Sequence, residues 1–257
     1  YLQQSVDVYV YKAGKSDYDV VYITASGIGS SLKIDAGDLA AGAATIKADA
    51  RTVVEYYENS DATKTTKIDV EKNAPVYVNG YKFTGVTYPA DLAALLDGKD
   101  ATVEFVENTD DKYYDMVLVT MYEHGIVDTV EVAKEKINFL DSTSIKFDSS
   151  DSKQVVNLQD KNGNEIALED IKDDDVLAML VEGDSKSVSI ADGKISVAKA
   201  RTFAKNSNKI TVVDLGNNVV TGTIDSSDDK KGDYKIYIDG TEYEVSNFVD
   251  GNYGKVY

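Results

Sequence analysis

The sequence predicts a mainly β protein made of tandem small β-barrel-like units of the OB or SH3 kind, with short helical turns. Three observations predict this class. β-Branched and aromatic residues alternate with polar ones along most of the chain, as in residues 6–11 and 102–107, and this is the period of half-buried strands. Segments with a helical pattern are few and short. One succession of strands and turns also returns after about 97 residues.

The first expected element is a β-hairpin over residues 6–24. It has a strand, a polar turn and a second strand, and the same pattern recurs over residues 103–120. Tyr18 and Tyr114 open the second strand in the two copies and lie 96 residues apart. We therefore expect two hairpins of equal length, one in each repeat.

A third, more diverged hairpin is expected between residues 209–213 and 219–225. Its Gly222 follows a strand as Gly125 does, 97 residues earlier. The two intervals agree, so the chain is expected to repeat one unit of this length.

Tight turns are expected where Asn or Asp precedes Gly between strand-like segments. Both residues of such dipeptides tolerate positive φ, which a type I′ hairpin turn requires. The dipeptides are Asn79-Gly80, Asn162-Gly163 and Asp239-Gly240.

Helix is expected only over the Ala-rich residues 36–44 and over residues 89–96. In the second segment Pro89 suits the first turn, and Asp91 lies near the positive end of the helix dipole. One unit therefore consists of a strand that leaves a glycine, a variable stretch, an Asn/Asp-Gly hairpin, a helical turn and a closing hairpin.

In this register residues 1–24 are the closing hairpin of a preceding unit, and residues 25–121 and 122–221 are two β-barrel-like units. Residues 222–257 open a partial third unit, so we expect the chain to be cut from a longer array. A barrel is favoured over an immunoglobulin-like sandwich because small barrels commonly insert a helical turn and no Cys or Trp is present to form a sandwich core. The joins near His124 and Val220 contain no Pro- or Ser-rich linker, so restricted geometry between units is expected.

Composition excludes several function classes. The 257 residues include no Cys and no Trp, which excludes disulfides, thiolate zinc sites, iron–sulfur clusters and a cysteine nucleophile. A net charge of -18 repels nucleic acid and anionic lipid, so neither is expected as a partner. No apolar run reaches the ~20 residues of a membrane-spanning helix, so no membrane insertion is expected.

No catalytic residue is predicted, and the protein is not expected to be an enzyme. His124 is the only histidine, and Ser142 and Ser144 are no better placed to be its nucleophile than other serines. Composition leaves open a glycosidase-like pair of carboxylates, but nothing singles out one pair.

Calcium is the one metal that the acidic segments suggest. Asp173 and Asp175 are the candidate ligands, since the turn before Val176 can bring both carboxylates near a backbone carbonyl while Asp174 points away. The loop 160–165 resembles a calcium loop without its third acidic position and distal Glu. The alternative is diffuse screening of the net charge without a closed coordination shell, and no other cofactor is expected.

Tyrosine supplies most of the aromatic residues, with 18 Tyr against 6 Phe. Tyr rings cover an exposed sheet face while the hydroxyl stays in water. The alternative is a groove lined by residues such as Tyr81 or Tyr113 that binds a glycan or a protein.

The repeat resembles the internal β-repeat regions of surface-layer-homology-containing cell-surface proteins of clostridia and related bacteria. The resemblance is best over residues 101–245 and is carried by the following segments: 114–120, 125–130, 162–176, 220–224 and 238–245. It implies a secreted, cell-wall-associated protein of a Gram-positive bacterium whose units form a non-catalytic stalk or S-layer-like lattice part. The implied partners are neighbouring repeats, other surface proteins or cell-wall polymers, and no residue here is assigned to wall anchoring. The alternative function is an extracellular adhesion module for glycans or proteins.

Overall fold

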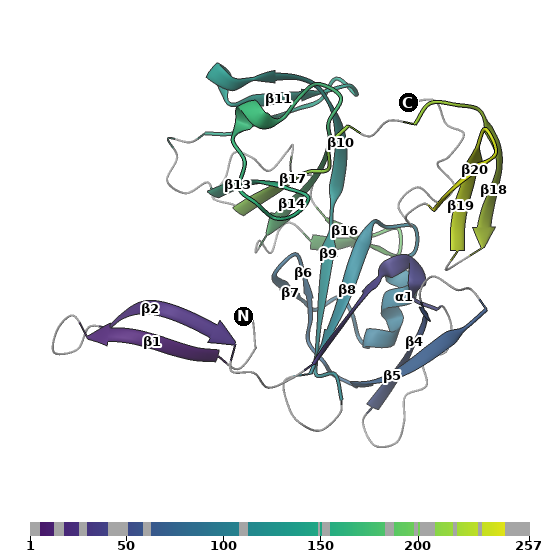
Figure 1. The fold of residues 1–257 in the computed structure, drawn as a ribbon. Helices are drawn as coiled ribbons and strands as arrows, with labels where there is room; N and C mark the ends of the chain where they lie inside the picture. Colours follow the sequence, from purple (N-terminus) through teal and green to yellow (C-terminus); the bar gives the residue numbers. More distant parts are fainter. Residues whose placement is uncertain are drawn as a thin grey trace.

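The structure is a computed structural model, and the prediction of a mainly β fold is confirmed (Figure 1). It describes residues 6–12, 18–25, 30–40, 51–58, 63–107, 113–148, 150, 155–182, 188–197, 200, 209–217, 220–230 and 233–244. In this part of the chain no helix is long and apolar enough to cross a membrane.

The strands up to β10 are β1 Val6–Lys12, β2 Tyr18–Ala25, β3 Ser31–Asp35, β4 Arg51–Tyr57, β5 Thr65–Glu71, β6 Val76–Val78, β7 Tyr81–Phe83, β8 Ala101–Val106, β9 Met116–Met121 and β10 Glu123–Glu131. The later strands are β11 Lys136–Phe139, β12 Ser144–Lys146, β13 Val155–Asp160, β14 Val176–Glu182, β15 Val188–Ala191, β16 Lys194–Val197, β17 Lys209–Asp214, β18 Ile224–Lys230, β19 Asp233–Ile238 and β20 Thr241–Glu244. The helical segments are η1 Ala36–Asp38, η3 Pro89–Asp91, α1 Leu92–Leu95, η4 Val132–Lys134 and η5 Leu168–Asp170.

The first expected hairpin is present. β1 and β2 pair antiparallel, with a bulge between Tyr9 and Val10.

The first larger sheet has the strand order β3-β8-β9-β6-β7. β6 runs parallel to β9, and the other neighbours are antiparallel. The β4–β5 hairpin forms a separate pair, joined to this group by isolated bridges from Leu39 to Tyr56 and from Val70 to Tyr114. We refer to the group from β3 to β9 as the first unit.

The second larger sheet has the order β12-β11-β10-β14-β17-β13. Its long strand β10 pairs with β14 through residues 123–126 and with β11 through residues 127–131. A register shift between Val127 and Thr129 lies within the β10–β11 pairing, next to the residue where β10 changes partner, and such a bulge bends a strand. We refer to the group from β10 to β17 as the second unit.

The two units share one order of pairing. β10, β14, β17 and β13 pair in the sequence and directions of β3, β8, β9 and β6, including the parallel step at the end. In both units the small hairpin, β4–β5 or β11–β12, lies in the chain before the parallel strand, and a helical turn follows that strand. The two units thus have one topology, while the repeat interval and the unit boundaries predicted above remain predictions. Across the described residues neither sheet closes into a barrel through a continuous ladder.

The expected tight turns are formed at two of the three dipeptides. Asn79 and Gly80 have φ of 47° and 78°, and Asp239 and Gly240 have φ of 48° and 76°, as a type I′ turn requires. At the third dipeptide only Gly163 has a positive φ, because the turn there is built around Asp160 instead.

The helical predictions hold in part. Residues 89–95 form η3 and α1, and Leu92 and the C-cap residue Leu96 are buried in the first unit. Of the expected helix over residues 36–44, the described residues 36–40 contain η1, and Leu39 leaves it in extended conformation to bridge Tyr56. Residues 41–44 lie outside the described residues.

The third expected hairpin is wrong. β17 pairs with β14 and β13, and the next strand, β18, pairs with β19 in a separate three-stranded sheet. A glycine at position 222 has another explanation than a repeat of Gly125. A Cβ at this position would come within 2.4 Å of Asp239 Oδ2 and 2.5 Å of Ile238 Cγ2. Gly222 therefore allows a close approach of two chain segments.

Each unit has its own hydrophobic core. Val103 and Phe105 alternate inward from β8 in the first unit, as Leu177 and Met179 do from β14 in the second. Full burial of such a side chain stabilises the fold by about 1.5–3 kcal/mol. The first core also contains two residues from β15 and β16, which lie in the chain between strands of the second unit.

Candidate functional site

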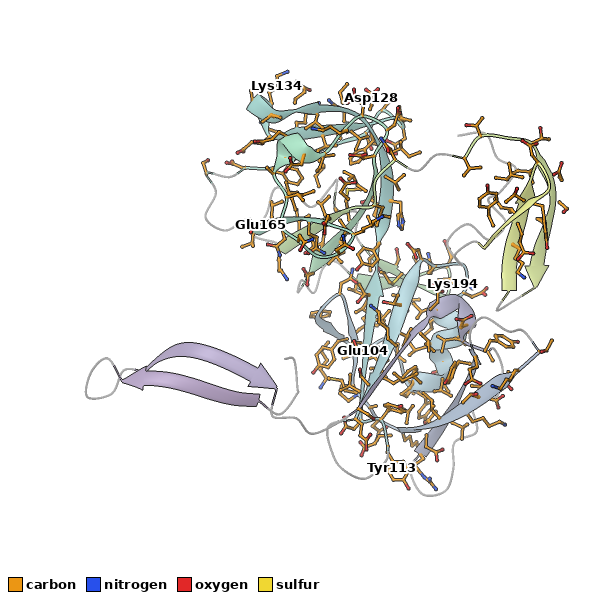
Figure 2. All side chains as sticks on the ribbon, viewed as in Figure 1. Glu104, Tyr113, Asp128, Lys134, Glu165 and Lys194 are labelled. Atoms are coloured by element: carbon orange, nitrogen blue, oxygen red, sulfur yellow. The ribbon has the colours of Figure 1, made fainter. Side chains whose placement is uncertain are left out.

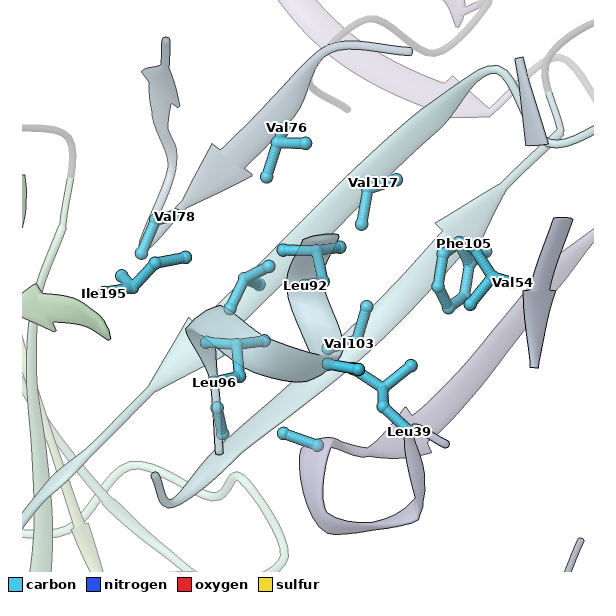
Figure 3. Packing of buried hydrophobic residues seen from close by; sticks show 14 of the residues in the cluster. Leu39, Val54, Val76, Val78, Leu92, Leu96, Val103, Phe105, Val117 and Ile195 are labelled. Carbon is cyan, nitrogen blue, oxygen red and sulfur yellow. The ribbon is translucent and has the colours of Figure 1, made fainter. Parts of the chain in front are cut away.

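The most informative site is the junction between the two units, where a hairpin inserted into the second unit reaches the first. The connection from β14 to β17 carries the antiparallel pair β15–β16, which we call the junction hairpin. Its Ile195 is fully buried and its Val188 is 7% exposed, and both belong to the core of the first unit. Figure 3 shows Ile195 beside Val78, with Leu92 and Leu96 in the same cluster. The second unit thus supplies part of the first unit's core.

An ion pair fixes the same contact at its rim. Lys194 Nζ lies 2.8 Å from Asp97 Oδ2, just beyond α1, with side-chain exposures of 33% and 45% (Figure 2). Pairs this exposed contribute at most about 1 kcal/mol. Burial of Ile195 therefore supplies most of the docking energy, and the ion pair orients the hairpin.

A second polar contact spans the junction at the start of β10. His124 Nε2 lies 3.0 Å from Asp100 Oδ2, which precedes β8. Burial lowers the pKa of His124, with Asp100 acting in the opposite direction, and burial raises the pKa of Asp100 despite the nearby imidazole. The sequence predicted a surface or junction histidine at this position but not its partner, because Asp100 becomes adjacent only through the pairing of strands distant in sequence.

The junction is also lined by Tyr122, whose pKa is raised by burial and by the charges of Asp100 and Glu182. Glu182 accepts a hydrogen bond from Thr211 Oγ1 at 2.8 Å and pairs with Lys209 at 2.9 Å. These polar groups join strands to one another.

The two predicted calcium ligands have different environments. Asp175 is 5% exposed, and its Oδ2 accepts a hydrogen bond from the Lys172 backbone N–H at 2.5 Å. Asp173 is exposed, and Asp174 is also exposed at a φ of 69°. Asp175 thus holds a turn together, and a metal role for Asp173 and Asp175 remains a prediction.

The strand register brings other carboxylates near Asp175. Asp160 and Asp214 lie opposite each other at the ends of β13 and β17. Burial raises the pKa of Asp214, and the charges of Asp175 and Asp160 add to this effect. The segments described contain no group of three acidic or histidine side chains arranged to hold a metal ion.

The calcium-like loop 160–165 is held by internal hydrogen bonds. One Asp160 oxygen accepts the backbone N–H groups of Asn162 and Asn164, both at 2.8 Å, and the other accepts Asn164 Nδ2 at 2.8 Å. These donors lower the pKa of Asp160, the side chain of Asn164 most of all. The Asp160 carboxylate serves as the acceptor for a turn.

The two tyrosines named as ligand candidates already have neighbours. Arg51 lies over the Tyr113 ring, 4.9 Å from its centre, and Tyr81 packs against the first unit's core. Lys72 similarly lies over Tyr88 at 5.6 Å. Each of these rings has one face or edge in contact with the protein's own side chains.

A shallow pocket of about 400 Å³ lies on the second unit. We call it the end pocket, and it is lined by Val130, Val132, Glu169, Ile171, Lys172 and Asp173. The Lys172 ammonium donates to the Glu169 carbonyl oxygen. Figure 2 shows Lys134, two residues beyond Val132, at the end of the second unit away from the first unit, and Lys194 at the end that meets it.

The sequence interpretation missed the junction hairpin, although a local signal for it exists. Asp192-Gly193 lies between two short alternating segments, and these residues have φ of 52° and 73° in the structure. The same dipeptide rule that located Asn79-Gly80 finds this turn.

Comparison with protein-family models, with curated proteins and with solved structures found no match for this chain.

Proposed function

We propose that this protein is a non-catalytic structural array, a spacer in an S-layer-like or other cell-surface protein of a bacterium, exported and associated with the cell wall. The junction hairpin carries this proposal. A ligand-binding protein needs a site, whereas a spacer needs units that hold a fixed orientation. Insertion of Ile195 from the second unit into the core of the first meets that need.

The pairing order supports units of the small-barrel kind. The bridges from Leu39 to Tyr56 and from Val70 to Tyr114 connect the β4–β5 hairpin to the segment after β3 and to the segment before β9. The bent strand β10 connects two pairing partners in the second. We propose OB- or SH3-like barrels in which these connections are the points of closure.

The charge is consistent with an exposed structural role. A net charge of -18 keeps copies of the chain from associating non-specifically, and it favours cationic partners or cations that bridge to anionic wall polymers. Neighbouring repeats, other surface proteins and such polymers are the partners that we propose.

Surface labelling tests the proposed location. Antibodies against this chain, applied to intact cells of the source organism, should label the cell envelope without lysis. Labelling that requires lysis would overturn an extracellular role.

A glycan-array screen separates the spacer from the adhesion alternative. The spacer should give no saturable signal. Saturable binding to one sugar class that is lost in Tyr81→Ala or Tyr113→Ala would favour adhesion.

A further inference from the structure

The helical turn before the central strand has the same construction in both units. In the first unit the Tyr88 N–H donates to Asp91 Oδ2 at 3.2 Å, and in the second the Ala167 N–H donates to Asp170 Oδ2 at 2.8 Å. Each aspartate closes a single 3₁₀ turn, η3 or η5. The residue that follows each turn is buried in the core of its unit.

In the first unit α1 comes next, whereas the described residues 171–175 of the second unit contain no helix. In both units the chain then turns into the central strand, β8 or β14, with the same turn geometry. Gly98 and Asp174 both have a φ of 69°, and the turns are closed by backbone hydrogen bonds of 3.0 and 3.2 Å. The residue before each is an aspartate, Asp97 in the first unit and Asp173 in the second. Asp173 therefore holds the position of the residue that pairs with Lys194.

The two equivalent places differ in what covers them. In the first unit the junction hairpin lies there, with Lys194 on Asp97 and Ile195 in the core. In the second unit no described residue covers the place, which forms the end pocket, and Val132 there is 46% exposed.

A core position shows the same difference. Val78 lies opposite Val119 in the parallel pair of the first unit, as Leu158 lies opposite Val212 in the second. Val78, beside Ile195, is fully buried, whereas Leu158 is only partly buried. Within the part of the chain that the structure describes, the second unit thus has no counterpart of the junction hairpin at this position.

We propose that the end pocket receives a β-hairpin of the same kind as the junction hairpin, carried by another unit of this fold. The residues that follow its turn are a lysine and then an aliphatic residue, as Lys194 and Ile195 are. The lysine pairs with Asp173, and the aliphatic side chain packs on Val130, Val132 and Ile171.

The chemistry of the pocket suits this occupant. Its wall is half aliphatic, and its charged side chains are Glu169, Asp173 and one lysine. The Lys172 ammonium is held by a backbone carbonyl, so the two carboxylates favour a cationic partner. Because Lys172 stands where the first unit has Leu96, the pocket is shallower than the site under the junction hairpin, and we expect weaker docking.

This inference rests on the proposed array, and it states how units connect: each unit covers the end of the unit before it. The contact is heterologous, since a hairpin meets a different surface, and such contacts propagate along an array instead of closing into a pair.

The test uses the intact chain and a cyclised peptide with the sequence of residues 188–197. We expect saturable amide shifts at residues 130–132 and 169–173 in ¹⁵N spectra. Val132→Asp should weaken binding at least ~10-fold, because a charge replaces an aliphatic contact. Ala133→Asp, on the same exposed turn but outside the pocket, is the matched control and should leave binding unchanged.

A charge exchange tests the ion pair. Asp173→Lys should weaken binding of the peptide. A peptide that carries Lys194→Glu should recover most of the lost affinity for the Asp173→Lys protein. Absence of saturable shifts at the pocket, or shifts confined to the amides of Leu96 and Asn79 where the peptide displaces the chain's own hairpin, would overturn the proposal. Binding unaffected by both pocket variants would overturn it as well. None of these outcomes bears on the array itself, which is tested by the orientation of the two units already present.

Discussion

Replacing Ile195 by alanine should destabilise the first unit, although Ile195 belongs to an insertion between strands of the second. Ile195 is fully buried in the first core. Large-to-small substitutions of such residues cost about 2–5 kcal/mol, the sum of lost transfer free energy and the cavity left behind. The partly exposed Lys194–Asp97 pair, which contributes at most about 1 kcal/mol, does not offset this loss.

Hydrogen exchange measures where the loss appears. The Leu96 N–H donates to the Leu92 carbonyl at 2.9 Å and the Asn79 N–H to the Val119 carbonyl at 2.9 Å, so both amides report on the core beneath the hairpin. A loss of 2 kcal/mol corresponds to roughly 30-fold faster exchange if local opening limits it. The Val127 N–H, bonded within the second unit, should change far less.

Ile190→Ala is the matched control. Ile190 lies opposite Ile195 in the same hairpin but is 44% exposed, so its truncation should change stability by less than about 0.5 kcal/mol. If Ile195→Ala speeds exchange only within residues 188–197 and leaves Leu96 and Asn79 at their original rates, the hairpin is not part of the first core.

Four further expectations follow from single contacts. His124→Gln should remove a pH dependence of the protein's stability. Because burial lowers the pKa of His124, the stabilisation by neutral His124 is complete above its unfolded pKa of 6.5 and is lost as pH falls toward the folded pKa. The melting temperatures of wild type and variant should therefore converge as the pH is lowered. Asp214→Asn should raise stability at neutral pH, because burial and the charges of Asp175 and Asp160 raise the Asp214 pKa and penalise its charged form once pH rises through it; since the group is only partly buried, solvent screening limits the gain to at most a few tenths of a kcal/mol, and urea melts showing an equal effect at low pH would contradict this. Asn79→Ala should lower the free energy of unfolding, measured by chemical denaturation, by about 1–3 kcal/mol. The buried Asn79 side chain accepts a hydrogen bond from Met121 N at 2.8 Å and donates one to Met121 O at 3.1 Å, and its removal leaves both groups unsatisfied. A loss below about 0.5 kcal/mol would be inconsistent with that role. Calcium, compared with sodium at matched ionic strength, should raise the melting temperatures of wild type, Asp173→Asn and Asp175→Asn by the same increment, whereas a micromolar, calcium-specific rise lost in the variants would establish a dedicated site.

Local patterns predicted much of the fold. Alternation located β1, β2, β8, β9 and β17, and the Asn-Gly and Asp-Gly dipeptides located the turns at Gly80 and Gly240, because both signals depend on residues close in sequence. The shared topology of the two units, in which β9 and β17 pair in the same order with their neighbours, is a finding of the structure, and the interval of about 97 residues stays a prediction.

Contacts between distant segments could not be predicted in this way. The third expected hairpin was wrong because β17 pairs with β14, from which an insertion separates it in the chain, and not with the segment that follows it. The similarity of Gly222 to Gly125 does not specify which strands pair. The prediction for His124 did not include its contact with Asp100. The prediction of Asp175 as a metal ligand did not include the hydrogen bond that its carboxylate accepts from the Lys172 N–H. Each of these partners is defined by tertiary structure.

The distance between the two units tests the central claim most directly. The chain has no cysteine, so spin labels at Lys82→Cys and Asp128→Cys, both exposed, report the orientation of the first unit to the second by pulsed electron paramagnetic resonance. The interlocked junction predicts a single narrow distance distribution, as narrow as that of a control pair at Lys82→Cys and Ala94→Cys within the first unit, and it predicts broadening when Ile195→Asp is added. A broad distribution in the otherwise unaltered chain, or one that Ile195→Asp leaves unchanged, would contradict the claim that the junction hairpin holds the two units in one orientation.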